Sequence, residues 1–437
     1  MKGLAAGGEG TETRRFFFAA GGGEWTREYF SPQIFMFDSK ELFRALEFAH
    51  YAERFRGETF VIALPAGASF SELLLDFKVF AGYRIGLVLV TEDPDFMLDG
   101  VISKANQRGA RFDFSIVTDL IFSRETQAID LDFTRIEKSL AQGKTPVIAY
   151  QGGEEKAGMV SPGAAPPGAT PPGAAPEPLD AAYILAAAVA GRIKPRKLFL
   201  VHPITEPLIR LLPHGAVQEA ELDTIASQLG SELQAEAIPL LGFIRENLVL
   251  GIPDVVLIRG VSGELFREVF THDGAGVIFN ATVQSQIRKA KLSDVTDIAL
   301  LLRSDIAAGR ILPKDENAIE ANIGAYWIYE IDGMCVGLAC LNAYGEEAEM
   351  SQFSTLPRYR GKGRARELAR QLIAEAGAQG YRGVFALSVD QRMWEFFLSL
   401  GFQRVARESL PEGWRRQYDM NRDSRAFRMK LPIREHR

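Results

Sequence analysis

The chain is poor in the residues that build metal centres and disulfide frameworks. Its 437 residues include two cysteines, Cys335 and Cys340, and five histidines. Because both cysteines fall on one apparent strand, we expect reduced core residues rather than a disulfide or a zinc site. No histidine pattern lies near them, which argues against a covalent acyl-cysteine intermediate. The sequence therefore predicts chemistry without a bound metal.

Long apolar runs and an excess of positive charge are also missing. No segment approaches the ~20 apolar residues of a membrane-spanning helix, and the first residues lack the apolar stretch of a signal peptide. A formal net charge of -6 at pH 7 argues against nucleic acid as the main partner. Hydrophobic residues make up 47% and charged residues 24% of the chain, as in soluble globular proteins. We expect a cytoplasmic protein of two or three domains that binds neither membranes nor nucleic acid.

The first half of the chain alternates short apolar runs with helical patterns. The runs cover residues 60–64, 85–90, 146–150, 197–201 and 255–258. Such alternation is typical of an α/β fold with a mostly parallel sheet covered by helices. Two stretches differ. The glycine-rich residues 1–30 are expected to be poorly ordered and receive no function. The Pro/Gly/Ala tract at 157–178 is expected to be a disordered insertion in this domain, with an interdomain linker as the alternative.

A basic, glycine-rich loop in the second half lies between an apparent strand and an apparent helix. It reads Arg360-Gly361-Lys362-Gly363-Arg364-Ala365, an RxxGxA pattern. Its glycines let the backbone turn with N–H groups pointing inward, and the positive end of the helix dipole adds to the same spot. The loop is therefore predicted to bind a pyrophosphate. The alternative is a surface turn before a basic helix.

The elements after this loop form a recognisable order. A helical pattern covers 367–376, an apolar strand covers 383–389, and a further helix covers 394–400 and stops at Gly401-Phe402. This order resembles the GNAT acetyltransferase superfamily over roughly residues 285–437. In that superfamily the glycine-rich loop binds the pyrophosphate of acetyl-coenzyme A, so the resemblance implies an acetyltransferase that uses acetyl-CoA as co-substrate.

Residues 45–280 resemble the amino acid kinase fold. The segments that carry the resemblance are 56–62, 179–188 and 263–276. Where an active kinase has a lysine and a Gly-Gly pair after its first strand, this chain has Ala63-Leu64-Pro65-Ala66-Gly67. Without the lysine charge, and with proline removing an N–H group, phosphoryl transfer loses its electrostatic stabilisation. We therefore expect a non-catalytic, regulatory domain.

An amino acid kinase-like domain fused to a GNAT domain is similar to the bacterial N-acetylglutamate synthase family, whose tail also resembles residues 410–425. The resemblance implies a kinase-like domain at 31–282, a GNAT domain at 283–437 and a homo-oligomer. It implies transfer of the acetyl group of acetyl-CoA to L-glutamate, giving N-acetyl-L-glutamate and CoA, the first step of arginine biosynthesis. Two alternatives stay open: acetylation of another amino acid or amine, and a binding protein without turnover.

The resemblance also assigns catalytic roles. Glu349 matches the general base, which needs burial to raise its pKa; the alternative is a solvated carboxylate on a charged hairpin. A backbone N–H of Phe353 or Ser354 matches the group that polarises the thioester carbonyl. Ser388 matches the residue that assists the leaving thiolate. Because the segment after Ser388 is longer than in the family, Asp390 is the alternative.

Other positions match residues that bind the amino acids. Lys314, Arg422 and Ser424 correspond to the substrate-binding positions for glutamate. The family usually has arginine at the position of Lys314, and lysine offers a point charge instead of a planar fork. Glu268 and Gly274 match the pair that binds arginine as a feedback inhibitor in the family. A carboxylate suits this role because it can pair bidentately with a guanidinium. The alternative is a surface carboxylate at a helix end and a turn glycine.

Overall fold

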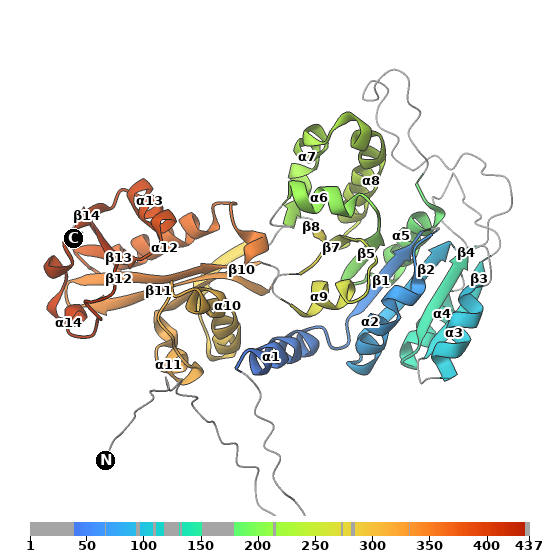
Figure 1. The fold of residues 1–437 in the computed structure, drawn as a ribbon, viewed down its shortest axis with the longest axis horizontal. Coiled ribbons are helices and arrows are strands. Elements are labelled where there is room, and N and C mark those ends of the chain that lie inside the picture. Colours follow the sequence, from blue (N-terminus) through green and yellow to red (C-terminus); the bar gives the residue numbers. More distant parts are fainter. Residues whose placement is uncertain are drawn as a thin grey trace, which may run out of the picture. The chain divides into compact units, whose positions relative to one another are not determined.

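The computed structural model describes residues 39–432, with gaps at 66, 93–96, 108–110, 118–130, 132, 151–178, 213–215, 272–273, 281–284 and 332. The first 30 residues and the tract at 157–178 therefore lie outside the described residues. From Phe43 to the C-terminal end the chain forms one compact unit, which contains two sheets (Figure 1). The last strand of one sheet ends at Asn280, and the first strand of the other begins at Ser285.

The kinase-like part is built on an eight-stranded sheet. Its strands are β1 (Thr59–Leu64), β2 (Gly86–Glu92), β3 (Phe112–Val117), β4 (Thr145–Tyr150), β5 (Lys197–Val201), β6 (Ala216–Gln218), β7 (Asp254–Ile258) and β8 (Val277–Asn280). They lie in the order β3-β4-β2-β1-β5-β7-β8-β6. All neighbouring pairs are parallel except β7 with β8. The predicted mostly parallel sheet is confirmed.

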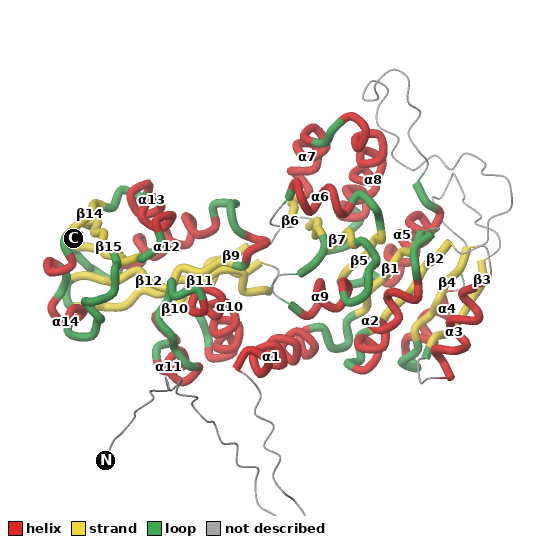
Figure 2. The backbone as a smooth tube through the Cα atoms, in the orientation of Figure 1, coloured by secondary structure: helices red, strands yellow, loops and turns green. Residues whose placement is uncertain are grey.

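Helices pack on both faces of this sheet (Figure 2). They are α1 (Ser39–Arg54), α2 (Phe70–Gly82), α3 (Met97–Gln107), α4 (Phe133–Ala141), α5 (Ala181–Ile193), α6 (Thr205–Leu211), α7 (Leu222–Gln228), α8 (Ser231–Val249) and α9 (Glu264–Phe270), with the short 3-10 helix η1 (Glu219–Glu221). Strand side chains alternate between faces. On β1, Phe60 and Ile62 join the apolar cluster of α1, α2 and α9, whereas Val61 and Ala63 join that of α5 and α8. Burial on both faces explains the continuous apolar runs of the sequence.

The C-terminal part has a seven-stranded, mainly antiparallel sheet. Its strands are β9 (Ser285–Lys289), β10 (Tyr326–Ile331), β11 (Met334–Tyr344), β12 (Glu347–Thr355), β13 (Gly383–Ser388), β14 (Gln403–Val405) and β15 (Arg425–Lys430). They lie in the order β14-β15-β13-β12-β11-β10-β9. Only β12 and β13, which are consecutive strands joined through a helix, pair in parallel.

The helices of this part are α10 (Val295–Ala307), α11 (Glu316–Ala321), α12 (Arg364–Ala378), α13 (Gln391–Ser399) and α14 (Glu412–Arg415), with 3-10 helices η2 (Leu292–Asp294), η3 (Ile323–Ala325), η4 (Pro357–Tyr359) and η5 (Arg407–Ser409). Helix α12 crosses from β12 to β13. Its residues Leu368, Leu372 and Ala376 are buried in a cluster with Trp327 of β10 and Met350 of β12. This packing fixes the start of α12, and with it the glycine-rich loop.

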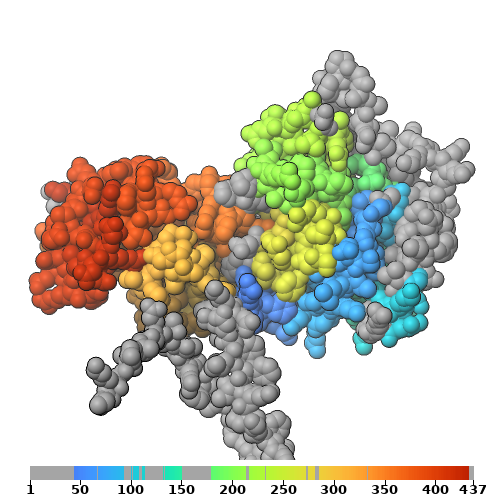
Figure 3. All heavy atoms as spheres, viewed as in Figure 1, coloured from blue at the N-terminus to red at the C-terminus, as the bar shows by residue number. Residues whose placement is uncertain are grey.

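Helix α9 packs on α1 through aromatic rings. The Phe48 ring lies 5.4 Å from that of Phe266 and 5.0 Å from that of Phe270, between centroids. In the space-filling view the yellow atoms around α9 lie against the blue atoms of α1 and α2 (Figure 3). The same apolar cluster includes Leu356 and Tyr359, which precede the glycine-rich loop. Helix α9 therefore belongs to the same packed core as the residues that lead into this loop.

Candidate active site

The parallel strands β12 and β13 separate partway along their length. Their pairing ends at Glu349, opposite Phe385. On the other side of β12, the register with β11 shifts between Leu338 and Cys340, and Gln352 adopts a φ of 56°. A bulge of this kind bends a strand and disrupts its ladder. The backbone of β12 after Glu349 is therefore no longer paired with β13.

Glu349 lies where the two strands separate. Its Oε1 accepts a hydrogen bond of 3.0 Å from Trp414 Nε1, and Asn342 is its register partner on β11. Burial raises the pKa of the Glu349 carboxyl above its ordinary value, while Trp414, the charge of Lys314 and Asn342 act in the opposite direction. Glu349 is thus a half-buried strand residue, not a carboxylate of the hairpin turn. A carboxylate with a raised pKa can accept a proton near neutral pH.

Cys340 lies near the same carboxylate. Its thiol is fully buried, and burial raises its pKa to about 12. At neutral pH the group is therefore a thiol, which is a poor nucleophile. This agrees with the expectation that no acyl-cysteine forms.

Neither Trp414 nor Asn342 was predicted to contact Glu349. Trp414 is 65 residues away from Glu349 and belongs to the short helix α14. Asn342 is nearer to Glu349 in the sequence. It is a polar residue in the apolar run of β11, and it lies opposite Glu349 across a tight hairpin. Cross-strand neighbours interact directly, so this pair was open to prediction.

The two residues proposed to polarise the thioester have side chains that are already engaged. The Phe353 ring lies 5.9 Å from that of Phe397, between centroids. The Ser354 hydroxyl is buried and contacts Leu301 O at 3.1 Å and Asp305 Oδ2 at 2.6 Å. The Ser354 contacts anchor β12 on α10, and the Phe353 ring packs on α13. With both side chains engaged, the backbone N–H groups are the candidates for a role in catalysis.

Ser388 ends β13, and Asp390 begins the next helix. The Ser388 Oγ accepts a 3.0 Å hydrogen bond from the backbone N–H of Asp390, so the hydroxyl proton is available for another acceptor. Asp390 caps α13 through Arg392 N and pairs with the Arg392 guanidinium at 2.8 Å. The hydrogen bond from Arg392 lowers the pKa of Asp390. An ionised carboxylate has no proton to donate, so the geometry favours Ser388 over Asp390.

The glycine-rich loop has the backbone shape expected for an anion site. Gly361 and Gly363 have φ values of 78° and 77°, a region that residues with a side chain rarely adopt. Helix α12 begins at Arg364, and Ala365 is its second residue. The N–H groups at the start of α12 and its dipole therefore point to one place.

The cationic side chains of the loop all have partners within the protein. Arg360 Nε donates to Thr355 O at 2.8 Å, and the buried Arg364 donates to Tyr359 O at 2.9 Å. Lys362 pairs with Glu221 of η1. A pyrophosphate at this loop would therefore be held mainly by backbone N–H groups.

Arg422 and Ser424 lie on the segment that leads into β15. Arg422 Nη2 donates to the carbonyl oxygens of Gly309 and Arg310 at 2.7 and 2.9 Å. Ser424 is buried and accepts a 2.8 Å hydrogen bond from the Tyr418 hydroxyl. Arg422 thus fastens the loop that follows α10, and its Nη1 and Nε groups are not used by these two bonds.

Lys314 belongs to the same loop between α10 and α11. Burial raises the pKa of the Glu349 carboxyl and of the Cys340 thiol, and the charge of Lys314 opposes this rise in both groups. Lys314 is thus near enough for its charge to act on Glu349, and Arg422 is hydrogen-bonded to the same loop. A substrate carboxylate bound by these two cations would lie beside the candidate base.

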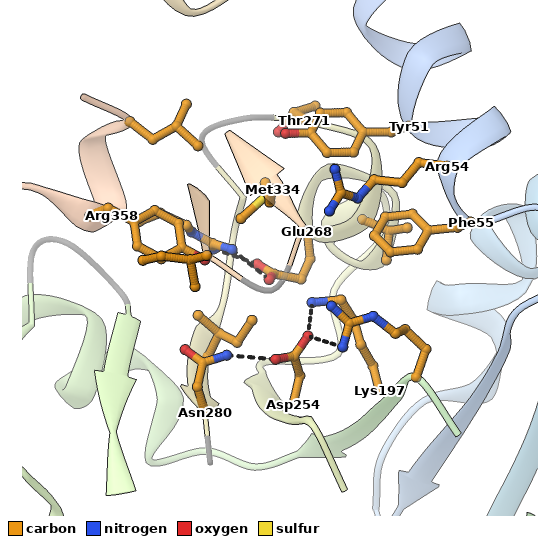
Figure 4. Close-up of a pocket in the computed structure, with 16 residues that line it drawn as sticks. Tyr51, Arg54, Phe55, Lys197, Asp254, Glu268, Thr271, Asn280, Met334 and Arg358 are labelled. Carbon is orange, nitrogen blue, oxygen red and sulfur yellow. Dashed lines mark hydrogen bonds and ion pairs between the residues drawn. The ribbon is translucent and has the colours of Figure 1, made fainter. Parts of the chain in front are cut away.

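Glu268 and Gly274 meet at one site, where both lie against the guanidinium of Arg358 on η4. Figure 4 shows the pair of Arg358 and Glu268. Arg358 donates to both oxygens of the buried Glu268 carboxylate at 2.9 and 2.8 Å. The N–H groups of Ala275 and Gly276 add bonds of 2.8 and 2.9 Å to the second oxygen. Burial alone would raise the pKa of Glu268, but the Arg358 guanidinium outweighs it and lowers the pKa to about 2. The carboxylate is thus fully ionised and already paired.

Two further observations come from the described ranges. No helix there is both long and apolar enough to span a bilayer. No group of three His, Cys, Asp or Glu side chains in these ranges could hold a metal ion.

The strand order of the second sheet, the separation of β12 from β13 and the loop before α12 are the features of a GNAT acetyltransferase fold. Residues 300–402 match the model of the acetyltransferase (GNAT) family. Among curated proteins, the amino-acid acetyltransferase of Ralstonia nicotianae is 31% identical over 252 residues, which cover 56% of this chain and 55% of that protein. That of Neisseria meningitidis serogroup B is 28% identical over 239 residues, 54% of each chain. The chain spans about half the length of the curated relatives it matches.

A solved structure supports the fold over a longer range. The N-acetylglutamate synthase from Neisseria gonorrhoeae, crystallised with coenzyme A and L-arginine, superimposes with a TM-score of 0.52 and 19% identity, covering 88% of this chain and 98% of that one. The resemblance found in the sequence and the predicted two-part fold are thus confirmed.

Proposed function

We propose that the chain transfers the acetyl group of acetyl-CoA to the amino group of L-glutamate, giving N-acetyl-L-glutamate and CoA. The observation that carries the proposal is the position of Glu349. Its half-buried carboxylate has a raised pKa and lies where β12 leaves β13. An acetyl transfer to an amine needs a base at such a place, because the ammonium must lose a proton before it attacks.

The other steps fall to neighbouring groups. The backbone N–H of Phe353 or Ser354 donates to the thioester oxygen as negative charge develops there. The tetrahedral intermediate collapses as the C–S bond breaks, and the Ser388 hydroxyl donates a hydrogen bond to the departing thiolate. The base takes the proton of the amine, directly or through water. The acetyl group passes straight from sulfur to nitrogen, since Cys340 is held as a buried thiol.

The loop at Arg360–Ala365 is the proposed site of the acetyl-CoA pyrophosphate. Two glycines with positive φ and the first turn of a 15-residue helix support this proposal, because such backbones offer N–H donors to anions. Lys314 and Arg422 are the proposed partners of the glutamate carboxylates, with Ser424 supporting the segment through Tyr418. We infer no metal requirement, because every step is assigned to an amino acid side chain or the backbone.

The kinase-like part is assigned a regulatory role. Strand β1 ends at Leu64 and is followed by Pro65, which has no N–H to offer a phosphate. L-arginine is the proposed ligand of this part, at Glu268 and Gly274. We also propose a cytoplasmic homo-oligomer, with domain limits at 31–282 and 283–437.

The test is release of CoA from acetyl-CoA by the purified chain, with L-glutamate compared with a panel of other amino acids, each with and without L-arginine. Turnover selective for glutamate supports the proposal. Turnover with another amine supports the alternative of a different substrate. If no amine is acetylated while acetyl-CoA still binds, the chain is a binding protein and the proposal is wrong.

A further inference from the structure

Two ion pairs attach the glycine-rich loop and the residues just before it to the kinase-like part. Arg358, on η4 just before the loop, holds the Glu268 carboxylate of α9 through both of its terminal nitrogens. Lys362, inside the loop, pairs with Glu221 of η1. The partners are 90 and 141 residues apart in the sequence. The stretch from Arg358 to Lys362 is thus held by carboxylates of the kinase-like part at both ends.

The site around Glu268 has the chemistry of a guanidinium site. Its carboxylate oxygens face the two terminal nitrogens of Arg358 side by side, the fork geometry that distinguishes guanidinium from ammonium. Gly274 forms the other wall, with a φ of 62°. A Cβ atom there would overlap the Arg358 guanidinium. The glycine therefore leaves the room that the guanidinium fills.

A small cavity of about 40 Å³ lies beside this ion pair (Figure 4). On its floor Asp254 is neutralised by Lys197 at 3.0 Å and accepts from Asn280 at 2.6 Å. Arg54 also lines the cavity, and in the part of the chain that the structure describes it forms no hydrogen bond or ion pair. The guanidinium of Arg54 thus gives the cavity a positive charge that a carboxylate could pair with.

The cavity is too small for an amino acid while Arg358 stays in place. At this size it has room for a few water molecules. If Arg358 left, the vacated guanidinium position and the cavity would form one space. A carboxylate that recognises guanidinium would lie at one end, and the guanidinium of Arg54 would line the other part.

We propose that Arg358 is a built-in occupant of a guanidinium site formed by Glu268 and Gly274, and that a free guanidino amino acid such as L-arginine binds there only by displacing it. A tethered group competes at a high effective concentration, so the free ligand binds more weakly than the site itself would allow. Displacement also releases η4, which leads directly into the loop at Arg360–Ala365. The inference deepens the proposed regulation by arginine, and it rests on that function only for the identity of the ligand.

The experiment measures binding to the full chain by calorimetry, without acetyl transfer. The ligands are L-arginine, guanidinium chloride and, as the uncharged isostere, L-citrulline. The proteins are the wild type, Arg358→Ala, and the double variant with Arg358→Ala and Glu268→Gln. Because the readout is binding, a failure of the proposed acetyl transfer leaves the result intact, and a failure here leaves the turnover assay intact.

We expect Arg358→Ala to bind L-arginine at least about tenfold more tightly than the wild type, since the tethered competitor is gone. Guanidinium should bind with the same gain, citrulline should show none, and Glu268→Gln should abolish the gain. Equal arginine affinity in the wild type and Arg358→Ala overturns the inference, and so does a gain that survives Glu268→Gln. Should Arg358→Ala fail to fold, Arg358→Lys carries the comparison, because an ammonium gives up the fork and should yield an intermediate affinity; an affinity no higher than that of the wild type overturns the inference.

Discussion

Trp414 donates its indole N–H to the Glu349 carboxylate at 3.0 Å, across 65 residues of sequence. The Trp414 ring is itself fixed, since it is buried and stacks on Tyr418 with centroids 4.4 Å apart. This hydrogen bond favours the charged form of a carboxyl group whose pKa burial raises. Burial and the Trp414 hydrogen bond thus have opposite effects on the pKa of Glu349, and the hydrogen bond can be removed by substitution.

Trp414→Phe removes the hydrogen bond and keeps an aromatic ring in place. The charged form of Glu349 loses a stabilising donor, so its pKa rises further. A general base must be deprotonated to act, and the acidic limb of the kcat/KM profile should therefore move to higher pH. Trp394→Phe is the control, because it removes an indole N–H that donates to the backbone oxygen of Ser388 and not to Glu349. The acidic limb of this variant should stay where it is in the wild type. An unshifted limb in Trp414→Phe, measured over the full pH range, would contradict the role of this pair.

Glu349→Gln tests the base directly. Without a carboxylate to accept the proton, kcat should fall by about 100- to 10,000-fold, the usual worth of general base catalysis. Binding of acetyl-CoA should stay unchanged, because Glu349 lies on β12 and not in the loop. The matched control is Glu346→Gln in the hairpin turn, where the exposed carboxylate pairs with Arg382. Similar losses in both variants would remove Glu349 from the mechanism.

Ser388→Ala and Asp390→Asn separate the two candidates for assisting the thiolate. Loss of one hydrogen bond to a charged group costs about 1.5–3 kcal/mol, so Ser388→Ala should lower kcat by about 10- to 100-fold. Asp390→Asn keeps a good N-cap for α13 and should leave kcat nearly unchanged. Single-turnover rates report the chemical step in each variant. The reverse order of effects would assign the role to Asp390.

The local patterns of the sequence predicted the parts that local physics determines. Strands buried on both faces, such as β1 and β5, are continuous apolar runs. The loop glycines and the start of α12 at Arg364 follow from backbone rules that act over a few residues. Strands β3 and β6 were not predicted. In β3, Asp113 and Ser115 interrupt the apolar run, and β6 has only three residues.

The partners of the site residues could not be predicted in this way. The sequence predicts Glu268 and Gly274 as one guanidinium-binding pair, but the guanidinium that lies against them in the fold belongs to Arg358, 90 residues beyond Glu268. Lys362 likewise has the composition of a phosphate ligand, and only the fold reveals Glu221 beside it. Such pairs depend on how two sheets pack, which leaves no periodic signal in either segment.

Arg422→Ala tests recognition of the substrate carboxylate. Loss of a charge-assisted hydrogen bond of about 1.5–3 kcal/mol should raise the KM for L-glutamate by about 10- to 100-fold. The preference for L-glutamate over L-glutamine should fall too, whereas the KM for acetyl-CoA should not change. Arg415→Ala is the control, since the exposed Arg415 donates to Leu410 O. A loss that affects both amino acids equally would mean that Arg422 does not bind the side-chain carboxylate, and that it contacts the α-carboxylate common to both or only fastens the loop at Gly309.

Gly274→Ala tests how closely Arg358 fits its site. A methyl group there would overlap the guanidinium, and the φ of 62° is strained for alanine. Gly143→Ala is the matched control, because Gly143 has a φ of 66° and a Cβ atom there would meet no neighbour within 4 Å. Both variants should lose about 1 kcal/mol from strain, and Gly274→Ala should lose a further ~1–3 kcal/mol from overpacking. Chemical denaturation of both variants gives the difference. If the two lose the same stability, Arg358 moves aside at no cost, and the ion pair with Glu268 does not hold the loop.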